Sequence, residues 1–271
     1  MPPRIVIVGF GNLGQAIARG AIASGLAAPS EIGATDPEPA QRARAQELGL
    51  RMVDHASIGV SEAVLFAVKP QSFLEAARSV GRIAAEGPLV VSVMAGVRSN
   101  AIRDALGGAA RVVRAMPNTP AAIGCAITAV ASDADVFEED FARVEQLFAS
   151  VGKTVRVPEA LFDAVTAVSG SGPAFVFRFL EAWTAAAESL GLPEEKAAAL
   201  ARETLIGAAA LLKASDEEPH VLRARVTSKG GTTAAGLARM EDASARSGGI
   251  DELMLETMRA ARDRGTELGR A

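Results

Sequence analysis

Short runs of apolar residues recur through the first half of the chain, and helix-like stretches separate several of them. Apolar strands that alternate with helices are typical of a parallel β-sheet covered by helices on both faces. Crossovers between parallel strands are right-handed, so the pattern predicts a doubly wound α/β fold. The expected strands are residues 4–8, 31–35, 63–68, 89–93, 111–115, 127–131 and 155–157.

The pattern changes after Pro158, where we find no further convincing strand. Glycine- and proline-containing breaks at 191–193 and 247–249 separate helical stretches. The sequence therefore predicts an α/β domain over residues 1–158 and an all-helical domain over residues 159–271. The helices expected in the second domain are residues 159–168, 173–190, 194–213, 218–226, 232–245 and 249–267.

Residues 197–212 form an unusually apolar predicted helix, in which only Arg202 and Glu203 are charged. A helix that is apolar nearly all round has to be buried on nearly all sides. A helical domain of this size has few fully surrounded positions. We therefore expect a second subunit to cover this helix, so that the protein is a homodimer.

Composition narrows the classes of function. The 271 residues are 49% hydrophobic and 22% charged, as in soluble globular proteins, and the net charge is −4. That charge provides no basic surface for nucleic acid or for an anionic membrane. The sequence has neither a signal-peptide pattern nor a run of about 20 uncharged apolar residues, so we expect a cytoplasmic protein without a membrane partner.

The rarest residue types exclude several kinds of active site. The chain has no tyrosine, which rules out a Tyr–Lys pair of the short-chain dehydrogenase type. Cys125 is the single cysteine, so a disulfide framework and a multi-cysteine metal site are both excluded. His55 and His220 are too few to favour a histidine-based zinc site or a Cys–His nucleophile. We expect no bound metal.

A glycine motif between the first expected strand and a helix predicts dinucleotide binding. In this setting Gly9 permits a tight turn, Gly11 lets the backbone approach a pyrophosphate, and Gly14 lets the helix pack close to the sheet. The helix N-terminus offers free N–H groups and a partial positive charge to the phosphates. The alternative is a strand–turn–helix that binds nothing. The motif is Gly9, Phe10, Gly11, Asn12, Leu13 and Gly14.

Asp36 follows the second expected strand, where an acidic residue usually accepts hydrogen bonds from the adenosine ribose. That position favours NADH, because a carboxylate repels the 2′-phosphate of NADPH. Arg42 and Arg44 lie just downstream and can turn towards such a phosphate. The alternative, which does not exclude the first, is that Asp36 caps a helix starting at Pro37.

Three further strand ends carry residues that we assign to coenzyme or substrate, because ligands bind at the carboxyl ends of strands in this fold. Lys69 can be catalytic, although a solvated lysine at the start of a loop is the commoner situation. The prolines of Met116-Pro117-Asn118-Thr119-Pro120 stiffen a loop that suits a substrate entrance, or simply a well-made turn. The residues assigned to the coenzyme are Ala67, Val68, Lys69, Pro70, Ala95, Gly96 and Asn118.

Two glycine-rich loops precede helices in the second domain. Residues 169–173, SGSGP, look like a helix start that binds an anion or amide. Residues 227–233, TSKGGTT, centre on glycines whose N–H groups can form a nest for a carboxylate. One such loop can be plain helix capping, but two behind a dinucleotide domain favour a substrate site.

These motifs, taken together and in order, closely resemble those of the pyrroline-5-carboxylate reductase family. The resemblance runs over nearly the whole chain and includes AVKP at 67–70, MPNTP at 116–120 and SGSGPAF at 169–175. Its most specific part is VTSKGGTTAAGLARMED at 226–242. It implies a Rossmann domain for NADPH or NADH, followed by an all-α dimerisation domain whose dimers can assemble into a decamer of five dimers.

The resemblance also implies roles for individual residues in binding pyrroline-5-carboxylate. The family's serine and threonine fall on Ser228 and Thr233, and an upstream acidic residue falls on Asp216. Asp36 departs from the serine, threonine or asparagine that is common in the family, which brings the usual preference for NADPH into question. The implied substrate-binding residues are Ser228, Gly230, Gly231, Thr232 and Thr233.

The implied reaction is reduction of a cyclic imine to L-proline, with Thr233 as the candidate donor to the imine nitrogen. The coenzyme carries the hard step, so the lack of a catalytic histidine or tyrosine is acceptable. Two alternatives remain. One is a β-hydroxyacid dehydrogenase, although neither Lys196 nor Lys213 lies in that family's glycine-rich helical motif. The other is a sensor that binds NAD(P)H without turnover.

Overall fold

The computed structural model describes residues 2–132, 136–242 and 249–269 of the chain. By compactness the chain divides into two units, which are described separately below. The first unit comprises Met1–Ser171 together with Ala261–Ala271, and the second comprises Gly172–Ala260. The last strand ends at Arg156, close to the domain boundary expected at residue 158, but the segment up to Ser171 groups with the sheet.

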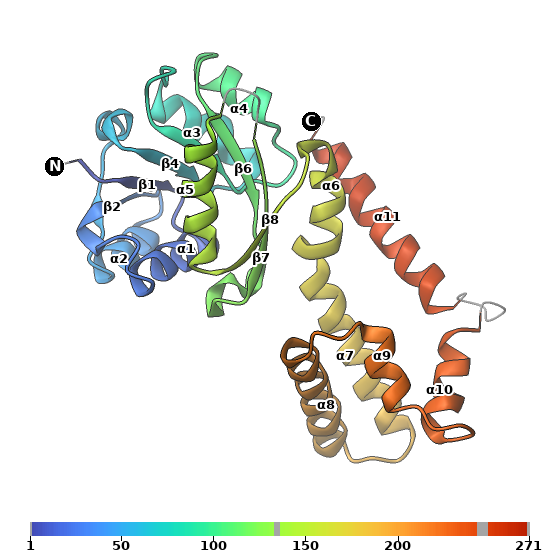
Figure 1. The fold of residues 1–271 in the computed structure, drawn as a ribbon. Helices are drawn as coiled ribbons and strands as arrows, with labels where there is room; N and C mark the ends of the chain where they lie inside the picture. Colours follow the sequence, from blue (N-terminus) through green and yellow to red (C-terminus); the bar gives the residue numbers. More distant parts are fainter. Residues whose placement is uncertain (1, 133–135, 243–248, 270–271) are drawn as a thin grey trace. The chain divides into compact units, whose positions relative to one another are not determined.

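The first unit is built on one eight-stranded sheet with the order β3-β2-β1-β4-β5-β6-β7-β8 (Figure 1). Every expected strand is present within a few residues of its predicted position. The sequence pattern missed β3, because two residues are too few to form an apolar run. The strands are β1 Ile5–Val8, β2 Ile32–Thr35, β3 Arg51–Met52, β4 Ala63–Phe66, β5 Leu89–Ser92, β6 Val112–Met116, β7 Ala126–Ser132 and β8 Gly152–Arg156.

The alternating pattern predicted a wholly parallel sheet. This prediction is wrong for one pair of strands, because β7 runs antiparallel to β6. The other neighbouring pairs are parallel. The physical reason lies in the connection over residues 117–125, which contains only the 3₁₀ turn Thr119–Ile123. A parallel crossover needs a dozen or more residues, so this short link returns the chain in the opposite direction.

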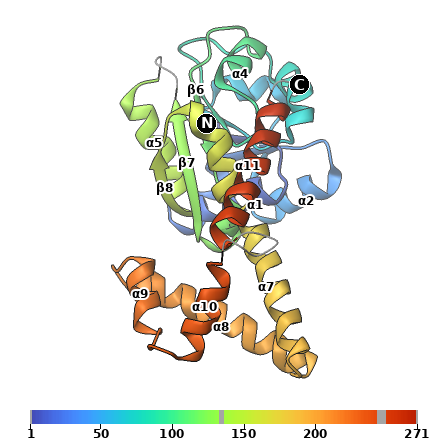
Figure 2. The same cartoon turned by 90° about the vertical axis from the view of Figure 1, so that its right-hand side faces the viewer.

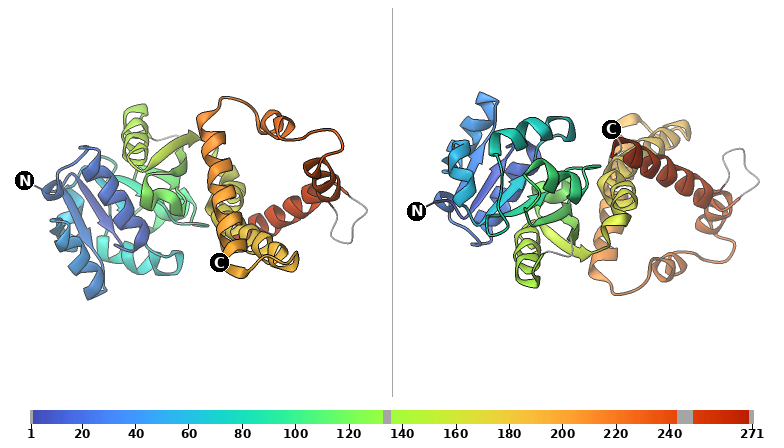
Figure 3. Two further views of the ribbon diagram at one scale, coloured as in Figure 1. Left: turned by 90° about the horizontal axis from the view of Figure 1, so that it is seen from below. Right: turned by 90° about the horizontal axis from the view of Figure 1, so that it is seen from above.

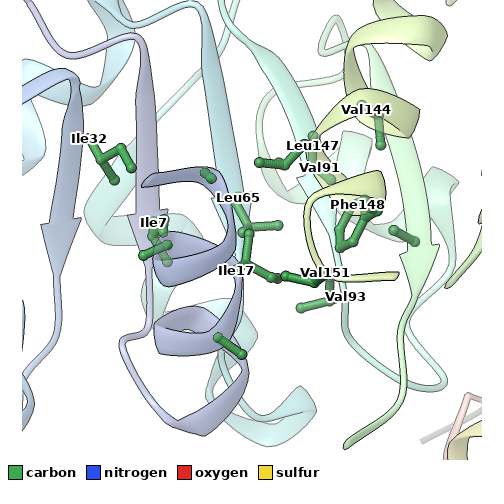
Figure 4. Packing of buried hydrophobic residues seen from close by; sticks show 14 of the residues in the cluster. Ile7, Ile17, Ile32, Leu65, Val91, Val93, Val144, Leu147, Phe148 and Val151 are labelled. Carbon is green, nitrogen blue, oxygen red and sulfur yellow. The ribbon is translucent and has the colours of Figure 1, made fainter. Parts of the chain in front are cut away.

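Helices cover both faces of the sheet, as predicted. Alternate residues of β1 divide between two cores, with Ile7 in one and Val6 and Val8 in the other. Figure 4 shows the first core, in which Ile17 of α1 and Phe148 of α5 pack over the strands. The helices on this face are α1 Asn12–Ala23, α2 Pro39–Glu47 and α5 Glu138–Ala149, and those on the other are α3 Phe73–Val80 and α4 Ser99–Ala105.

The segment after the last strand and the end of the chain also belong to this unit. A 3₁₀ turn at Glu159–Leu161, helix α6 at Phe162–Val165 and a π-helical stretch at Thr166–Gly170 follow one another. Helix α11, Ile250–Leu268, ends in the same unit, where the Thr266 hydroxyl donates to Asp163 over 2.9 Å. Further short 3₁₀ helices span Pro29–Glu31, His55–Val60 and Pro70–Ser72.

The second unit is helical, as expected, and its helices can be followed in Figure 2 and Figure 3. Helices α7 and α8 pack against each other and are joined by residues 190–193, where the sequence predicted a break. Helix α10 ends at Met240, earlier than the end predicted at residue 245, which lies outside the described residues. The helices are α7 Gly172–Ser189, α8 Glu194–Ala214, α9 Pro219–Arg225, α10 Thr232–Met240 and the first part of α11.

The helical unit has almost no core of its own. Among the described residues of 172–260, the buried hydrophobic side chains are Ala197 and Ala201, both on α8. Leu200 and Ile206 of the same helix are 57% and 51% exposed within the single chain. Further large apolar side chains of the unit are also exposed, including Val176, Phe177, Phe179, Trp183, Leu211, Leu212, Leu253, Met254 and Leu255.

One helical stretch, Glu159–Ser189, is long and apolar enough to cross a membrane by length and composition alone. It contains no uncharged run of about 20 residues, because Arg178 and Glu181 interrupt the apolar residues. Only 11% of its most apolar window is buried within the chain. Its apolar surface therefore needs a cover that the single chain does not supply.

Candidate active site

The three motif glycines meet different steric conditions. Gly9 has φ +94°, and a Cβ atom there would lie 2.8 Å from the Ala67 carbonyl oxygen. A Cβ on Gly14 would lie 2.5 Å from the Gly9 carbonyl oxygen, so the start of α1 packs directly on the turn. A Cβ on Gly11 would meet no heavy atom within 4 Å. The backbone at Gly11 is therefore open to a ligand, whereas Gly9 and Gly14 are required by the fold.

The start of α1 suits a pyrophosphate. Gly11 is the N-cap residue and makes no side-chain cap, so Asn12, Leu13 and Gly14 supply first-turn N–H groups without partners inside the helix. Such N–H groups and the positive end of the helix dipole bind phosphate. The open approach at Gly11 and these donors fit a dinucleotide coenzyme.

Asp36 uses its carboxylate to join two loops. One oxygen accepts a hydrogen bond from the backbone N–H of Phe10 at 2.7 Å, and the other accepts from the Glu38 N–H at 2.9 Å. The alternative that Asp36 caps a helix starting at Pro37 is wrong, because α2 starts at Pro39 with Glu38 as its N-cap. Glu38 precedes a proline, which disfavours helical geometry and holds its backbone extended.

The two arginines that follow are engaged locally. The Arg42 guanidinium donates to the carbonyl oxygens of Asp36 at 3.0 Å and Pro37 at 2.6 Å. Arg44 donates to the Gln41 side chain at 3.3 Å. Arg42 therefore lies beside Asp36 and Pro37, just after the end of β2.

The end of β4 lies beside the glycine turn, because β4 is the neighbour of β1 in the sheet. The end of β5 lies one strand further along. Ala67 and Val68 contact Gly9, while Lys69 is exposed, as expected for a solvated lysine. After β5, Gly96 adopts φ +75° and lies against Gly269 at the end of the chain. The assigned residues of both strand ends therefore lie at the carboxyl edge of the sheet.

The 116–120 loop forms one wall of a cavity of about 710 Å³ in the first unit. The Asn118 side-chain oxygen accepts from the Ile127 N–H at 3.1 Å, which fixes the loop against the start of β7. Asn118 is thus a polar group held in place, as expected. The lining includes Asn12, Leu13, Arg19, Met116, Asn118 and Thr166, so the cavity adjoins the glycine motif.

Residues 169–173 do not form the free helix start that the sequence predicted. The chain enters α7 directly from the π-helical stretch, in which the Ser169 hydroxyl donates to the Val165 carbonyl at 3.0 Å. The Ser171 N–H donates to the Thr166 carbonyl at 2.8 Å. These groups are therefore already bonded within the preceding turn. Gly170 and Ser171 still line the cavity.

The 227–233 loop opens α10, as predicted. Gly230 has φ +72°, and Gly231 is the N-cap residue. The Gly231 N–H donates to the Ser228 carbonyl at 3.1 Å, so this donor is used within the turn. Ser228, Thr232 and Thr233 are exposed, and the first-turn N–H groups of α10 have no partners within the helix. The loop can therefore present hydroxyls and amides to a carboxylate.

Asp216, the candidate acidic residue, is exposed. Its neighbour Glu217 pairs with Arg225 at 2.5 Å, which ties the segment before α9 to the end of that helix.

Sequence reasoning missed a cluster of charged residues at the carboxyl edge of the sheet. Arg114 on β6 is 4% exposed and donates to Glu159 at 3.0 Å. Burial lowers the pKa of Arg114 from its ordinary value, against the opposing effect of Glu159. Burial also opposes ionisation of Glu159, but hydrogen bonds from Ser99 and Arg114 outweigh it and lower its pKa. The available signal was an arginine inside an apolar run, VVRAM.

Two protein-family models match the two halves of the chain. Residues 159–268 match the family model for pyrroline-5-carboxylate reductase dimerisation. Residues 4–96 match a model described as NADP oxidoreductase, coenzyme F420-dependent. The first match covers the helical unit and the second covers the glycine motif together with the end of β5.

Full-length relatives agree. The pyrroline-5-carboxylate reductase of Synechocystis sp. is 39% identical over 273 residues, covering all of both chains. That of Arabidopsis thaliana is 35% identical and covers 99% of this chain and 96% of its own. A solved pyrroline-5-carboxylate reductase from Coxiella burnetii superposes with a TM-score of 0.90 at 32% identity, covering 100% of each chain.

These matches favour the reductase over the β-hydroxyacid dehydrogenase and the non-catalytic sensor that the sequence left open. They span both the dinucleotide-binding sheet and the helical unit. The chain therefore belongs to the pyrroline-5-carboxylate reductase family, whose members are NAD(P)H-dependent oxidoreductases of proline biosynthesis.

Proposed function

We propose that this protein reduces 1-pyrroline-5-carboxylate to L-proline with NADPH or NADH, using the residues assigned above. The observation that carries the coenzyme half is the open approach over Gly11 at the start of α1. The coenzyme, when bound, supplies the hydride for the carbon of the C=N bond. The protein then has to orient the two reactants and polarise the imine.

Thr233 is our candidate donor to the imine nitrogen. An imine accepts hydride poorly until its nitrogen is protonated or hydrogen bonded, and the exposed hydroxyl at the start of α10 can donate there. Ser228 and the amides of Gly230 and Thr232 would hold the substrate carboxylate. The Gly231 amide is the weakest of the assigned donors, because it already bonds to Ser228.

We further propose a homodimer joined through the helical unit, with a decamer of five dimers as a higher assembly. The support is the missing core of residues 172–260 and the exposed apolar side chains of α7 and α8. A second copy is the cover best matched to these helices, because residues 159–268 match a dimerisation model. On this account the apolar stretch Glu159–Ser189 faces a partner subunit rather than lipid, and the enzyme is cytoplasmic.

The decisive test of the reaction is a substrate comparison with purified protein. The reduced-nicotinamide absorbance is followed after adding pyrroline-5-carboxylate with reduced coenzyme, 3-hydroxyisobutyrate with oxidised coenzyme, or buffer; imine reduction lowers this absorbance, and hydroxyacid oxidation raises it. Oxidation of the coenzyme by pyrroline-5-carboxylate alone supports the proposal. Turnover of the hydroxyacid would support the dehydrogenase, and tight coenzyme binding without turnover of either would support a sensor.

A further inference from the structure

The loop between β5 and α4, residues 93–98, is held by a partly buried polar cluster of Ser99, Arg114 and Glu159. Glu159 accepts from both the backbone N–H and the hydroxyl of Ser99, at 2.8 and 2.5 Å. Arg114 bonds to the same carboxylate at 3.0 Å and reaches the Met94 carbonyl oxygen at 3.4 Å. The β5–α4 loop is therefore anchored near its start by Arg114 and at its end by Glu159.

Two further contacts fix the same loop. A Cβ atom on Gly269 would lie 2.7 Å from the Gly96 carbonyl oxygen, so the two backbones pack closely. Arg98 lies 4.0 Å from Asp163, which also accepts the hydrogen bond from Thr266. The 159–163 segment and the end of α11 thus converge on a loop whose residues Ala95 and Gly96 are assigned to the coenzyme.

The strands beside this loop are also held together by backbone pairing and by the apolar core. Strands β5 and β6 pair in register, and their Val90 and Val112 are fully buried in the apolar core. A buried ion pair is a weak source of stability, because desolvation offsets much of the attraction between the charges. The Arg114 Nε atom is buried without a hydrogen-bond partner among the described residues. The cluster is therefore better explained by the geometry that it fixes than by the stability that it adds.

We propose that Glu159 is a positioning residue that sets the β5–α4 loop for the nicotinamide half of the coenzyme. The inference rests on the proposed function, because it assumes that Ala95 and Gly96 face the coenzyme. Ligands of this fold bind at the carboxyl ends of the strands, where this loop lies. Glu159 acts through Ser99 and Arg114 and touches neither reactant.

The test uses three variants of the full-length enzyme. Ser99→Ala removes one donor to Glu159 and leaves the Arg114 pair intact, while Glu159→Gln weakens every anchor made by the carboxylate. Arg156→Gln is the matched control, since Arg156 forms ion pairs with Glu138 and Glu145 and stacks on Phe141, but at the exposed edge strand β8. NADPH affinity is measured by fluorescence titration without substrate, beside steady-state kinetics and the thermal midpoint.

We expect the dissociation constant for NADPH to rise roughly three- to tenfold in Ser99→Ala and further in Glu159→Gln. The Michaelis constant of both loop variants for pyrroline-5-carboxylate should stay at the wild-type value. The NADPH affinity of Arg156→Gln should also be that of the wild type. Wild-type NADPH affinity in both loop variants, with only a lower thermal midpoint, would overturn the positioning role. If instead the wild-type enzyme fails to oxidise NADPH with pyrroline-5-carboxylate, the proposed function itself is wrong.

Discussion

The Asp36 carboxylate accepts a hydrogen bond from the backbone N–H of Phe10, with 2.7 Å between the two atoms. The residue that follows β2 therefore holds the glycine turn that follows β1. A carboxylate has further lone pairs, so this bond leaves acceptor sites for the ribose hydroxyls of a coenzyme. Asp36 therefore combines a structural role in the turn with a negative charge after β2, where we propose that the adenosine ribose binds.

We predict that Asp36→Ser raises the preference for NADPH over NADH. The substitution removes a charge that repels the 2′-phosphate and leaves Arg42 at the end of β2 to attract it. The measurement is the ratio of kcat/KM for the two coenzymes. Asp36→Asn is the control, because its amide oxygen can still accept from Phe10 without carrying a charge. Better use of NADH by Asp36→Ser would refute the ribose role.

Gly11→Asp should abolish coenzyme binding in a folded protein. The side chain would enter open space at the N-terminus of α1, where a carboxylate would exclude and repel the pyrophosphate. We expect affinity to fall by more than about a hundredfold in calorimetry. Gly14→Ala should instead cost about 1–3 kcal/mol of folding stability, because its Cβ would collide with the Gly9 carbonyl. Unchanged NADPH affinity in Gly11→Asp would remove the motif from the site.

The protein should have no stable monomer at micromolar concentration. Ile206 lies on α8, where it is 51% exposed in the single chain, and a partner subunit would bury it. Ile206→Glu should therefore dissociate the dimer or unfold the helical unit, since burying an unpaired charge is very costly. Light scattering measures the mass of the wild-type protein and of the Ile206→Glu variant. A monodisperse, folded wild-type monomer would contradict the dimer.

The lowered pKa of Glu159 predicts an acid-dependent loss of stability. A carboxyl group whose pKa is lower in the folded state stabilises the protein above its ordinary pKa of about 4.3. This contribution is lost as the pH falls through the folded-state value. Urea unfolding at a series of pH values should show a shallower acid limb in Glu159→Gln. Identical pH dependence in the two proteins would mean that the ion pair contributes nothing.

Much of the fold could be predicted because the strands are continuous apolar runs and the breaks contain glycine or proline. The direction of β7 could not be predicted, because it depends on how short the link over residues 117–125 is. That link itself resembles a functional loop. The 169–173 segment was misjudged because a π-helical turn and a free helix start share the same glycines. Arg114 was missed because its partner Glu159 is distant in sequence and only the fold brings them together.

Thr233→Ala should lower kcat more than it raises KM for pyrroline-5-carboxylate. A donor to the imine nitrogen acts mainly in the transition state, and one such bond is worth about 1–3 kcal/mol, or roughly ten- to a hundredfold in rate. Thr233→Ser keeps the hydroxyl and should retain most activity. Ser228→Ala should act mainly on KM. A wild-type turnover number in folded Thr233→Ala would leave Thr233 as a helix-start residue only.

The most direct test of the account follows the hydride itself. Pyrroline-5-carboxylate is reduced by the enzyme with NADPH carrying deuterium at the transferred position, and the product is analysed by mass spectrometry and NMR. We predict proline equal in amount to the coenzyme oxidised, with one deuterium on the ring carbon next to nitrogen that does not bear the carboxylate. Coenzyme oxidation without labelled proline, or no oxidation at all, would contradict the assignment.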